Sequence, residues 1–284
     1  MSDRSEHSNG QGQGADDRWA VILGASTGTG AAVARAVIRD PGLHVFAVHR
    51  GHYPDDAAAL ATELGDSGRT VVMHVGDAGH PEGIAVCADA LARAAGPRKV
   101  SLLVHSISGA SIGHFLSTRG DAFHPKQFEK TFNYLAHSFA YWAQTLHERD
   151  LLAPQARLLG LSNALHGENL LHNTGLIAAA KAALQTYVKY LAVELGRHGH
   201  RVNLLQFATV LTPALRTVLG PKAIARLEEV HAEMIPAGRM CTLEEVARFV
   251  SLLTREETAW FNGATIDFLG GMTLRLFDMV LQPD

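Results

Sequence analysis

The stretch Leu23-Gly24-Ala25-Ser26-Thr27-Gly28-Thr29-Gly30 decides how this chain folds. It follows a short apolar run at 19–23 and leads into a helical pattern at 28–39, so it joins a strand to a helix. The three glycines allow a tight turn and a close approach of the backbone, and N–H groups at a helix start attract anions. The stretch therefore predicts a site for the pyrophosphate of a dinucleotide.

The rest of the chain, after this first strand and helix, continues to alternate predicted strands and helices. Apolar runs predict strands at 43–48, 70–75, 100–105, 156–161, 201–206 and 264–268. Helical patterns lie between most of them, at 56–64, 81–95, 125–149, 175–197 and 243–253. Seven strands alternating with helices imply an α/β fold, a Rossmann-like doubly wound parallel sheet covered on both faces. We expect a single domain over 18–284, preceded by a disordered polar tail at 1–17.

Composition excludes several classes of protein. Of the 284 residues 47% are apolar, which suffices for a continuous core, and the net charge of −3 argues against nucleic-acid binding. No apolar run reaches the ~18 residues of a membrane span. Two distant cysteines, Cys87 and Cys241, indicate a reducing compartment, and sixteen scattered histidines lack metal-ligand spacing. We expect a cytoplasmic protein with no membrane span, no nucleic-acid partner and no bound metal.

The end of the second predicted strand bears on the choice of dinucleotide. A carboxylate there would accept the 2′-hydroxyl of NAD, but the chain has His49-Arg50 and no carboxylate until Asp55. A guanidinium can instead pair with the 2′-phosphate of NADP. Arg50 therefore favours NADPH over NAD as the cofactor, and the alternative is an exposed arginine at a loop start.

These residues and several later motifs resemble the short-chain dehydrogenase/reductase family over about positions 18–274. The G-x-x-x-G-x-G spacing of the turn is that family's. The other matching stretches are Lys181-Ala-Ala-Leu184, Leu191-Ala-Val-Glu-Leu195, His200-Arg-Val-Asn203, Pro236-Ala-Gly-Arg239, Asn262-Gly263 and Gly270-Gly271. The resemblance implies an NAD(P)-dependent oxidoreductase.

Three short strings are similar to the enoyl-thioester (enoyl-ACP) reductase branch of that family. They are Gly24-Ala-Ser-Thr-Gly28, Gly76-Asp77-Ala78 and His105-Ser106-Ile107-Ser108, the last where the family commonly has Asn-Asn-Ala-Gly. This resemblance implies reduction of an activated alkene or ketone, such as an acyl or polyketide-type thioester.

The resemblance also implies which residues form the site. In this family a lysine holds the nicotinamide ribose, a serine orients the substrate oxygen, and an asparagine supports the lysine through water. The matching positions are Lys181, Ser162 and Asn133. The implied cofactor contacts are Gly24, Ser26, Thr27, Gly28, Gly30, Arg50, Asp77, Ser106, Ile107, Lys181, Val210 and Thr212.

The tyrosine that donates a proton to the substrate oxygen in this family has no counterpart here. The spacings that would place it before Lys181 fall on Ile177, Thr174 and His172. An imidazole can donate a proton near neutral pH, so our hypothesis is that His172 stands in, with His166 and His137 as the other candidates. A loop or packing role remains open for each histidine.

The segment 211–240 resembles a substrate lid. It is rich in apolar residues, with Arg216, Lys222, Arg226 and Arg239 interspersed, which fits an acyl substrate and the phosphopantetheine of an acyl carrier protein. The family resemblance also suggests a homodimer or homotetramer. Two other functions remain open: a non-redox cyclase, isomerase or dehydratase on the same fold, and a non-catalytic dinucleotide-binding sensor or partner subunit.

Overall fold

A single seven-stranded parallel sheet organises the protein in a computed structural model that describes residues 17–163 and 173–274. The strand order is β3-β2-β1-β4-β5-β6-β7, and every neighbouring pair is parallel. The strands are β1 (Arg18–Leu23), β2 (Leu43–His49), β3 (Val71–Val75), β4 (Val100–His105), β5 (Leu152–Asn163), β6 (Arg201–Phe207) and β7 (Thr265–Phe268).

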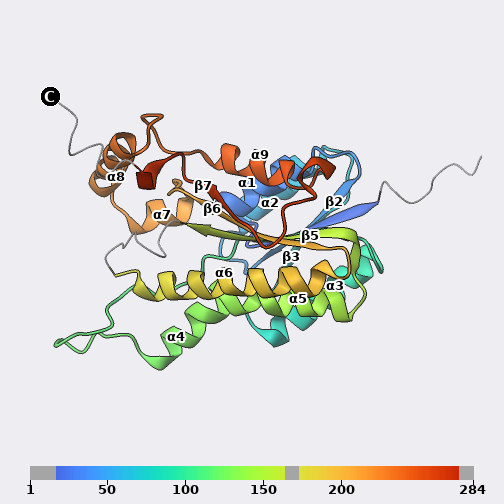
Figure 1. Cartoon of the computed structure of the whole chain (residues 1–284), viewed down its shortest axis with the longest axis horizontal. Coiled ribbons are helices and arrows are strands. Elements are labelled where there is room, and N and C mark those ends of the chain that lie inside the picture. The colour runs from blue at the N-terminus through green and yellow to red at the C-terminus, as the bar shows by residue number, and fades with distance from the viewer. Residues whose placement is uncertain (1–16, 164–172, 275–284) are drawn as a thin grey trace, which may run out of the picture.

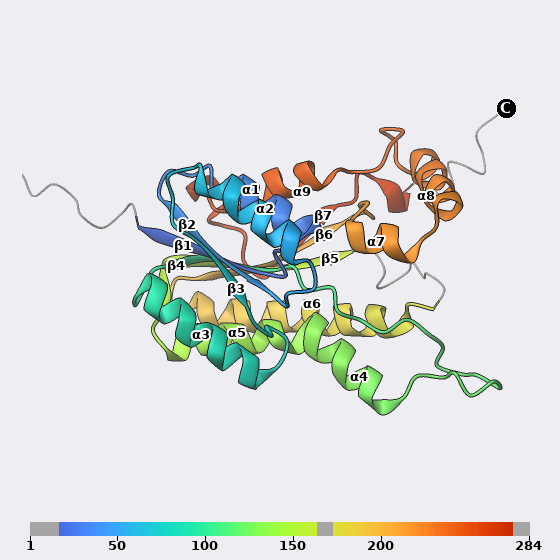
Figure 2. The same cartoon turned by 180° about the vertical axis from the view of Figure 1, so that it is seen from behind.

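Helices cover both faces of the sheet (Figures 1 and 2). One layer contains α1 (Gly28–Val37), α2 (Pro54–Gly65) and α9 (Leu243–Leu252). The opposite layer contains α3 (Pro81–Ala95), α4 (Pro125–Phe132), α5 (Ser138–Glu148) and α6 (Gly175–Gly196). Two further helices, α7 (Pro213–Val218) and α8 (Pro221–Met234), lie at one end of the molecule. The predicted single-domain, doubly wound Rossmann-like fold is confirmed.

Alternate residues of the strands point to opposite faces of the sheet and pack into two separate hydrophobic cores. In β1, Val21 and Leu23 pack on the side of Trp142 and Leu184, whereas Ala20 and Ile22 pack on the side of α1 and α9. Both sets are essentially inaccessible to solvent. Because both faces of the sheet are buried at its centre, the central strands β1 and β4 are mostly apolar, and this explains the apolar runs in the sequence.

The sheet reverses its winding direction between β1 and β4, and this is the place where doubly wound sheets bind ligands. The chain runs from β1 to β2 in one direction and reaches β4 on the other side of β1. The glycine turn at 24–28 follows β1 directly. The fold therefore places the predicted pyrophosphate site at the switch point.

The predicted helix over 125–149 is interrupted. A π-helix, η1 (Asn133–His137), separates α4 from α5. The Oγ of Ser138 donates a hydrogen bond to the carbonyl oxygen of Tyr134, at 3.2 Å. No proline or glycine marks this point in the sequence, so helical periodicity alone gives no sign of the wider turn.

Two boundaries also differ from the sequence predictions. Strand β5 begins at Leu152, before the predicted start, although it contains Pro154 and a left-handed Gln155 (φ 57°). Asp17, the last residue of the predicted tail, contacts the side chains of His44 and Lys99. Within the described ranges we find no helix with the length and apolar character needed to span a bilayer.

Trp142 tests the packing of the core beneath the site. Its side chain is fully buried and its Nε1 donates a hydrogen bond to the Ala78 carbonyl, at 3.1 Å. We expect Trp142→Phe to lower the free energy of unfolding by about 2 kcal/mol, because it removes buried atoms and leaves a carbonyl unpaired. Urea denaturation measures this, and Trp260→Phe is the matched control because Trp260 is 95% exposed. Equal losses in the two variants would contradict the assignment of Trp142 to the core.

Candidate active site

A cavity of about 590 Å³ lies at the carboxyl ends of the central strands. The glycine turn, the end of β2, the loop after β4, the end of β5 and the start of α6 all contribute to its wall. The lining includes most of the residues predicted to bind cofactor or substrate: Gly24, Ser26, Thr27, Gly28, Arg50, Ser106, Ile107, Ser162, Lys181, Val210 and Thr212. The fold thus brings together residues that lie up to 188 positions apart in the chain (24 to 212).

The glycine turn is packed too tightly for side chains. Gly24 has a φ of +83°, and a Cβ there would lie 2.6 Å from the Ser106 carbonyl oxygen. A Cβ on Gly30 would collide with the carbonyl oxygen of Gly24. Helix α1 starts at Gly28 with no acidic residue in its first turn and no side-chain cap from Thr27. The backbone N–H groups of the first turn of α1 therefore lack a side-chain acceptor. A pyrophosphate would supply acceptors for them, together with the negative charge that a helix start favours.

At the other end of the cavity, Arg50 lies over an aromatic ring. Its guanidinium carbon is 4.8 Å from the centroid of the Tyr134 ring, and its side chain is exposed. Arg50 forms no salt bridge within the described part of the chain. A cation at this position fits the 2′-phosphate predicted for an NADP-type cofactor.

Lys181 and Ser162 lie at the floor of the cavity. The Nζ of Lys181 donates a hydrogen bond to the Leu161 carbonyl oxygen at 2.7 Å, and both side chains are buried. Burial lowers the pKa of Lys181 to about 8, because desolvation disfavours the ammonium form. Lys181 therefore remains mostly cationic at pH 7 but is poised to release a proton in the neutral to mildly alkaline range.

His105 is a buried neighbour of Lys181 whose part in the site was not predicted. Its Nε2 is 2.8 Å from Ser138 Oγ, and its Nδ1 has no hydrogen-bond partner among the described residues. Since the Ser138 hydroxyl donates to Tyr134, Nε2 of His105 carries the proton. Burial, and secondarily the Lys181 charge, lowers the pKa of His105 to about 3. The imidazole is therefore neutral and adds no charge beside Lys181.

Gly30 and three predicted residues with other side-chain partners, namely Asp77, Asn133 and His137, are not part of the cavity lining. Asp77 accepts hydrogen bonds from Tyr134 Oη at 2.7 Å and from the Gly79 N–H at 2.8 Å. The Nδ2 of Asn133 lies 3.4 Å from Nδ1 of His80. The Nδ1 of His137 lies 2.9 Å from the Tyr187 hydroxyl, so this histidine joins η1 to α6. None of the three is part of the cavity wall.

An aliphatic side chain stands where the family's tyrosine is expected at the usual spacing. Ile177, four residues before Lys181, lines the cavity. Thr174 is buried and is not part of the lining. His166 and His172 lie outside the described residues. The protonation step thus needs a donor other than a phenol at position 177.

The basic residues of the predicted lid are partly neutralised. Arg226 pairs with Glu229 within α8, and Arg239 forms two hydrogen bonds with Glu245. Leu215 of α7 lines the cavity, so the start of the lid segment does border the site.

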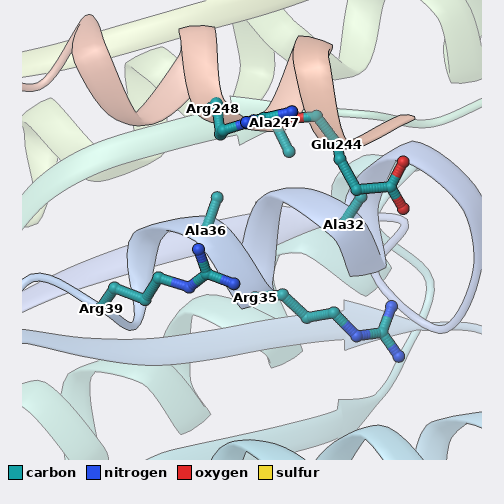
Figure 3. A pocket seen from close by; sticks show the side chains of 7 residues that line it. All are labelled: Ala32, Arg35, Ala36, Arg39, Glu244, Ala247 and Arg248. Carbon is teal, nitrogen blue, oxygen red and sulfur yellow. Dashed lines mark hydrogen bonds between the residues drawn. The ribbon is translucent and has the colours of Figure 1, made fainter. Parts of the chain in front are cut away.

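A second, smaller hollow of about 260 Å³ lies between α1 and α9 (Figure 3). It is lined by Ala32, Arg35, Ala36, Arg39, Glu244, Ala247 and Arg248, and it shares no residue with the large cavity. Arg35 already pairs with Glu63. None of the predicted site residues borders this hollow, so the large cavity is the candidate active site.

A doubly wound sheet with a glycine turn at its switch point, and with Ser162 and Lys181 beside it, defines a dinucleotide-binding oxidoreductase of the short-chain dehydrogenase/reductase type. The family described as Enoyl-(Acyl carrier protein) reductase matches residues 24–273. The chain belongs to this family of NAD(P)-dependent oxidoreductases, which confirms the resemblance seen in the sequence.

Several known proteins are similar to the chain over different lengths. An uncharacterized oxidoreductase (MT0954) of Mycobacterium tuberculosis is 29% identical over 95% of this chain and 97% of its own. The 1-cyclohexenylcarbonyl-CoA reductase of Streptomyces collinus is 25% identical over 93% of this chain and 90% of its own. The NADH-dependent enoyl-[acyl-carrier-protein] reductase FabI of Escherichia coli is 29% identical, but over only 48% of this chain and 51% of its own.

Solved structures show the same fold. A short-chain dehydrogenase from Burkholderia cenocepacia, solved in complex with NADP, superposes with a TM-score of 0.78 over 91% of this chain and 99% of its own, at 22% identity.

The buried lysine gives a titration that can be observed without a substrate. In protein labelled with ¹³C at lysine Cε, we expect one resonance to titrate with a midpoint of about 8 and to be missing from Lys181→Arg. The ordinary pKa is 10.5, so between pH 8 and 10.5 the unfolded chain binds more protons than the folded one. The contribution of Lys181 to stability therefore rises with pH in this window. A Lys181 resonance that titrates near 10.5 would contradict the burial.

Proposed function

We propose that the protein is an NADPH-dependent reductase of an activated alkene held as an acyl thioester, with a proton donor other than the family's tyrosine. The observation that carries the proposal is the cavity itself, which combines the glycine turn, Arg50, Ser162 and Lys181 with the aliphatic Ile177. The cofactor, when bound, supplies a hydride. The protein groups bind, orient and protonate the substrate.

The absent tyrosine favours an alkene over a ketone. Ketone reduction places full negative charge on the oxygen next to the hydride acceptor, and that oxygen needs a nearby acid. In a conjugated thioester the charge moves to the thioester oxygen, which a hydroxyl can stabilise by hydrogen bonding. Ser162 can donate such a bond, because its Oγ contacts only the Asn163 carbonyl, at 3.3 Å, among the described residues. The names of the Streptomyces and Escherichia relatives, both reductases of unsaturated thioesters, support this substrate class.

Arg50 supports NADPH over NADH. Its exposed guanidinium lies at the end of β2, and the carboxylate of Asp77 is held by a phenol and a backbone N–H. An unengaged carboxylate at this site would repel a 2′-phosphate. The Burkholderia neighbour was solved with NADP, whereas the Escherichia relative is named for NADH.

Lys181, His172 and His166 are the candidates for the proton donor. The pKa of about 8 makes the Lys181 ammonium a competent acid near neutral pH, and Lys181 lines the cavity beside Ser162. His172, the donor proposed from the sequence, lies outside the described residues. A donor with the pKa of Lys181 keeps activity up to pH 8, whereas an ordinary imidazole loses it above about 6.5.

The cofactor assignment is tested by fluorescence titration with NADPH and NADH. We expect wild-type protein to bind NADPH at least tenfold more tightly, and Arg50→Leu to lose that preference through the loss of one charge-assisted pair with the phosphate. Arg35→Leu is the control, since Arg35 borders the other hollow. Loss of NADPH absorbance with crotonyl-CoA then tests reduction. Product formation without loss of NADPH would support a non-redox enzyme, and binding without any turnover would support a sensor.

Restoring the missing phenol provides a second test. Ile177→Tyr recreates the tyrosine four residues before Lys181, where the side chain already faces the cavity. A well-placed general acid contributes about 10²–10⁴ in rate, so we expect kcat for acetoacetyl-CoA to rise at least tenfold, with a smaller change for crotonyl-CoA. Ile177→Phe has nearly the same bulk without the hydroxyl and serves as the control. Equal ketone rates in the two variants would show that position 177 does not correspond to the family's tyrosine.

A further inference from the structure

Tyr134 connects two charged residues at the adenosine end of the cavity, and it was not predicted as part of the site. It lies in the π-helix η1 and lines the cavity, yet only 6% of its surface is exposed. Its hydroxyl donates to Asp77 at 2.7 Å, and its ring lies 4.8 Å from the Arg50 guanidinium carbon. One side chain therefore touches both the cation and the carboxylate that bear on cofactor choice.

The ring is held in a slot that allows little movement. A Cβ on Gly79 would collide with the ring, and a Cβ on Gly109 would lie 3.2 Å from its Cγ. The His80 ring meets it edge-on, with centroids 5.2 Å apart. Because two glycine backbones and a histidine edge surround the ring, its orientation is fixed before any ligand binds.

A fixed ring restricts the position of Arg50. An exposed arginine side chain has many rotamers, and ordering it on a ligand costs free energy. The face of an aromatic ring attracts a guanidinium and so favours the rotamers that place it over the ring. Arg50 is thereby held at the cavity wall before a phosphate arrives.

The hydroxyl acts on the opposite charge. Asp77 has both oxygens engaged, one by Tyr134 and one by the Gly79 N–H. Burial, together with this hydrogen bond to Asp77, raises the pKa of Tyr134, so the phenol stays protonated and keeps donating. The carboxylate is consequently held against the protein and outside the cavity lining.

We infer that Tyr134 is a specificity-positioning residue, which selects a 2′-phosphorylated adenosine by holding Arg50 over the face of its ring. The inference rests on the proposed NADPH preference. Tyr134 acts through Arg50, so its removal reduces discrimination between phosphorylated and unphosphorylated riboses while general nucleotide binding remains.

The test uses two probes that differ only at the ribose, adenosine 2′,5′-bisphosphate and adenosine 5′-monophosphate. Isothermal titration calorimetry gives their Kd ratio for each variant. We expect Tyr134→Leu to reduce the ratio about tenfold, the range of a partly desolvated cation–π contact. Tyr134→Phe keeps the ring and should stay within about threefold of wild type. Tyr190→Leu, a control on the exposed face of α6, should leave the ratio unchanged.

A double variant separates a positioning role from a merely structural one. If Tyr134 acts through Arg50, Arg50→Leu combined with Tyr134→Leu has the same ratio as Arg50→Leu alone. Should Tyr134→Leu fail to fold, Tyr134→Phe is compared with pentafluorophenylalanine at position 134. The two rings are nearly equal in shape, but fluorination inverts the ring quadrupole, so the ratio should fall only for the fluorinated ring.

The outcomes separate this inference from the proposed function. Equal binding of the two probes by wild-type protein would overturn both. Suppose that Arg50→Leu abolishes the difference in Kd between the two probes, but that a folded Tyr134→Leu keeps the Kd ratio within twofold of wild type. That result would overturn the role of Tyr134 and leave the NADPH preference intact. Additive losses in the double variant, or equal ratios for the two matched rings, would also overturn it.

Discussion

The close approach of three backbone segments at the end of β1 is the constraint on which the rest of the site depends. A Cβ on Gly24 would collide with the carbonyl of Ser106, and a Cβ on Gly30, in the first turn of α1, would collide with the carbonyl of Gly24. This contact fixes the direction in which α1 leaves the sheet and aims its N–H groups at the cavity. It also ties the first strand–helix unit to the loop after β4, so both halves of the nucleotide site are positioned by one junction.

The floor of the cavity shows how burial changes the acidity of two titratable side chains. The ammonium of Lys181 donates to the Leu161 carbonyl, and its neighbour His105 is kept neutral by the same low-polarity surroundings. Desolvation therefore lowers the pKa of the lysine to about 8, and the aliphatic Ile177 lines the same cavity. The chemistry of the site follows from its burial as much as from the identity of its residues.

The sequence predicted those features of the fold and the site that depend on residues close together in the chain. The apolar runs predicted the strands and the type of sheet, and the glycine turn predicted the place of the phosphate site. Each of these patterns depends on neighbours within a few positions of the chain. Arg50, Ser162 and Lys181 were identified by motif, and the fold brings them to one cavity. The π-helix, the slot for Tyr134 and the environment of His105 could not be predicted, since they depend on residues far apart, such as Gly79 and Gly109 against position 134. Asp77 and Asn133 were assigned by motif alone, and their side chains point to other partners.

The π-helical turn at 133–137 restricts which changes of the chain this region tolerates. A single residue more or less in a helix rotates everything after it by about 100° around the helix axis. Deleting one residue of η1 would therefore turn Phe139, Trp142 and Leu146 away from the core that they now fill. A residue of η1 therefore cannot be deleted without unpacking α5, whereas a substitution at position 134 leaves α5 in place.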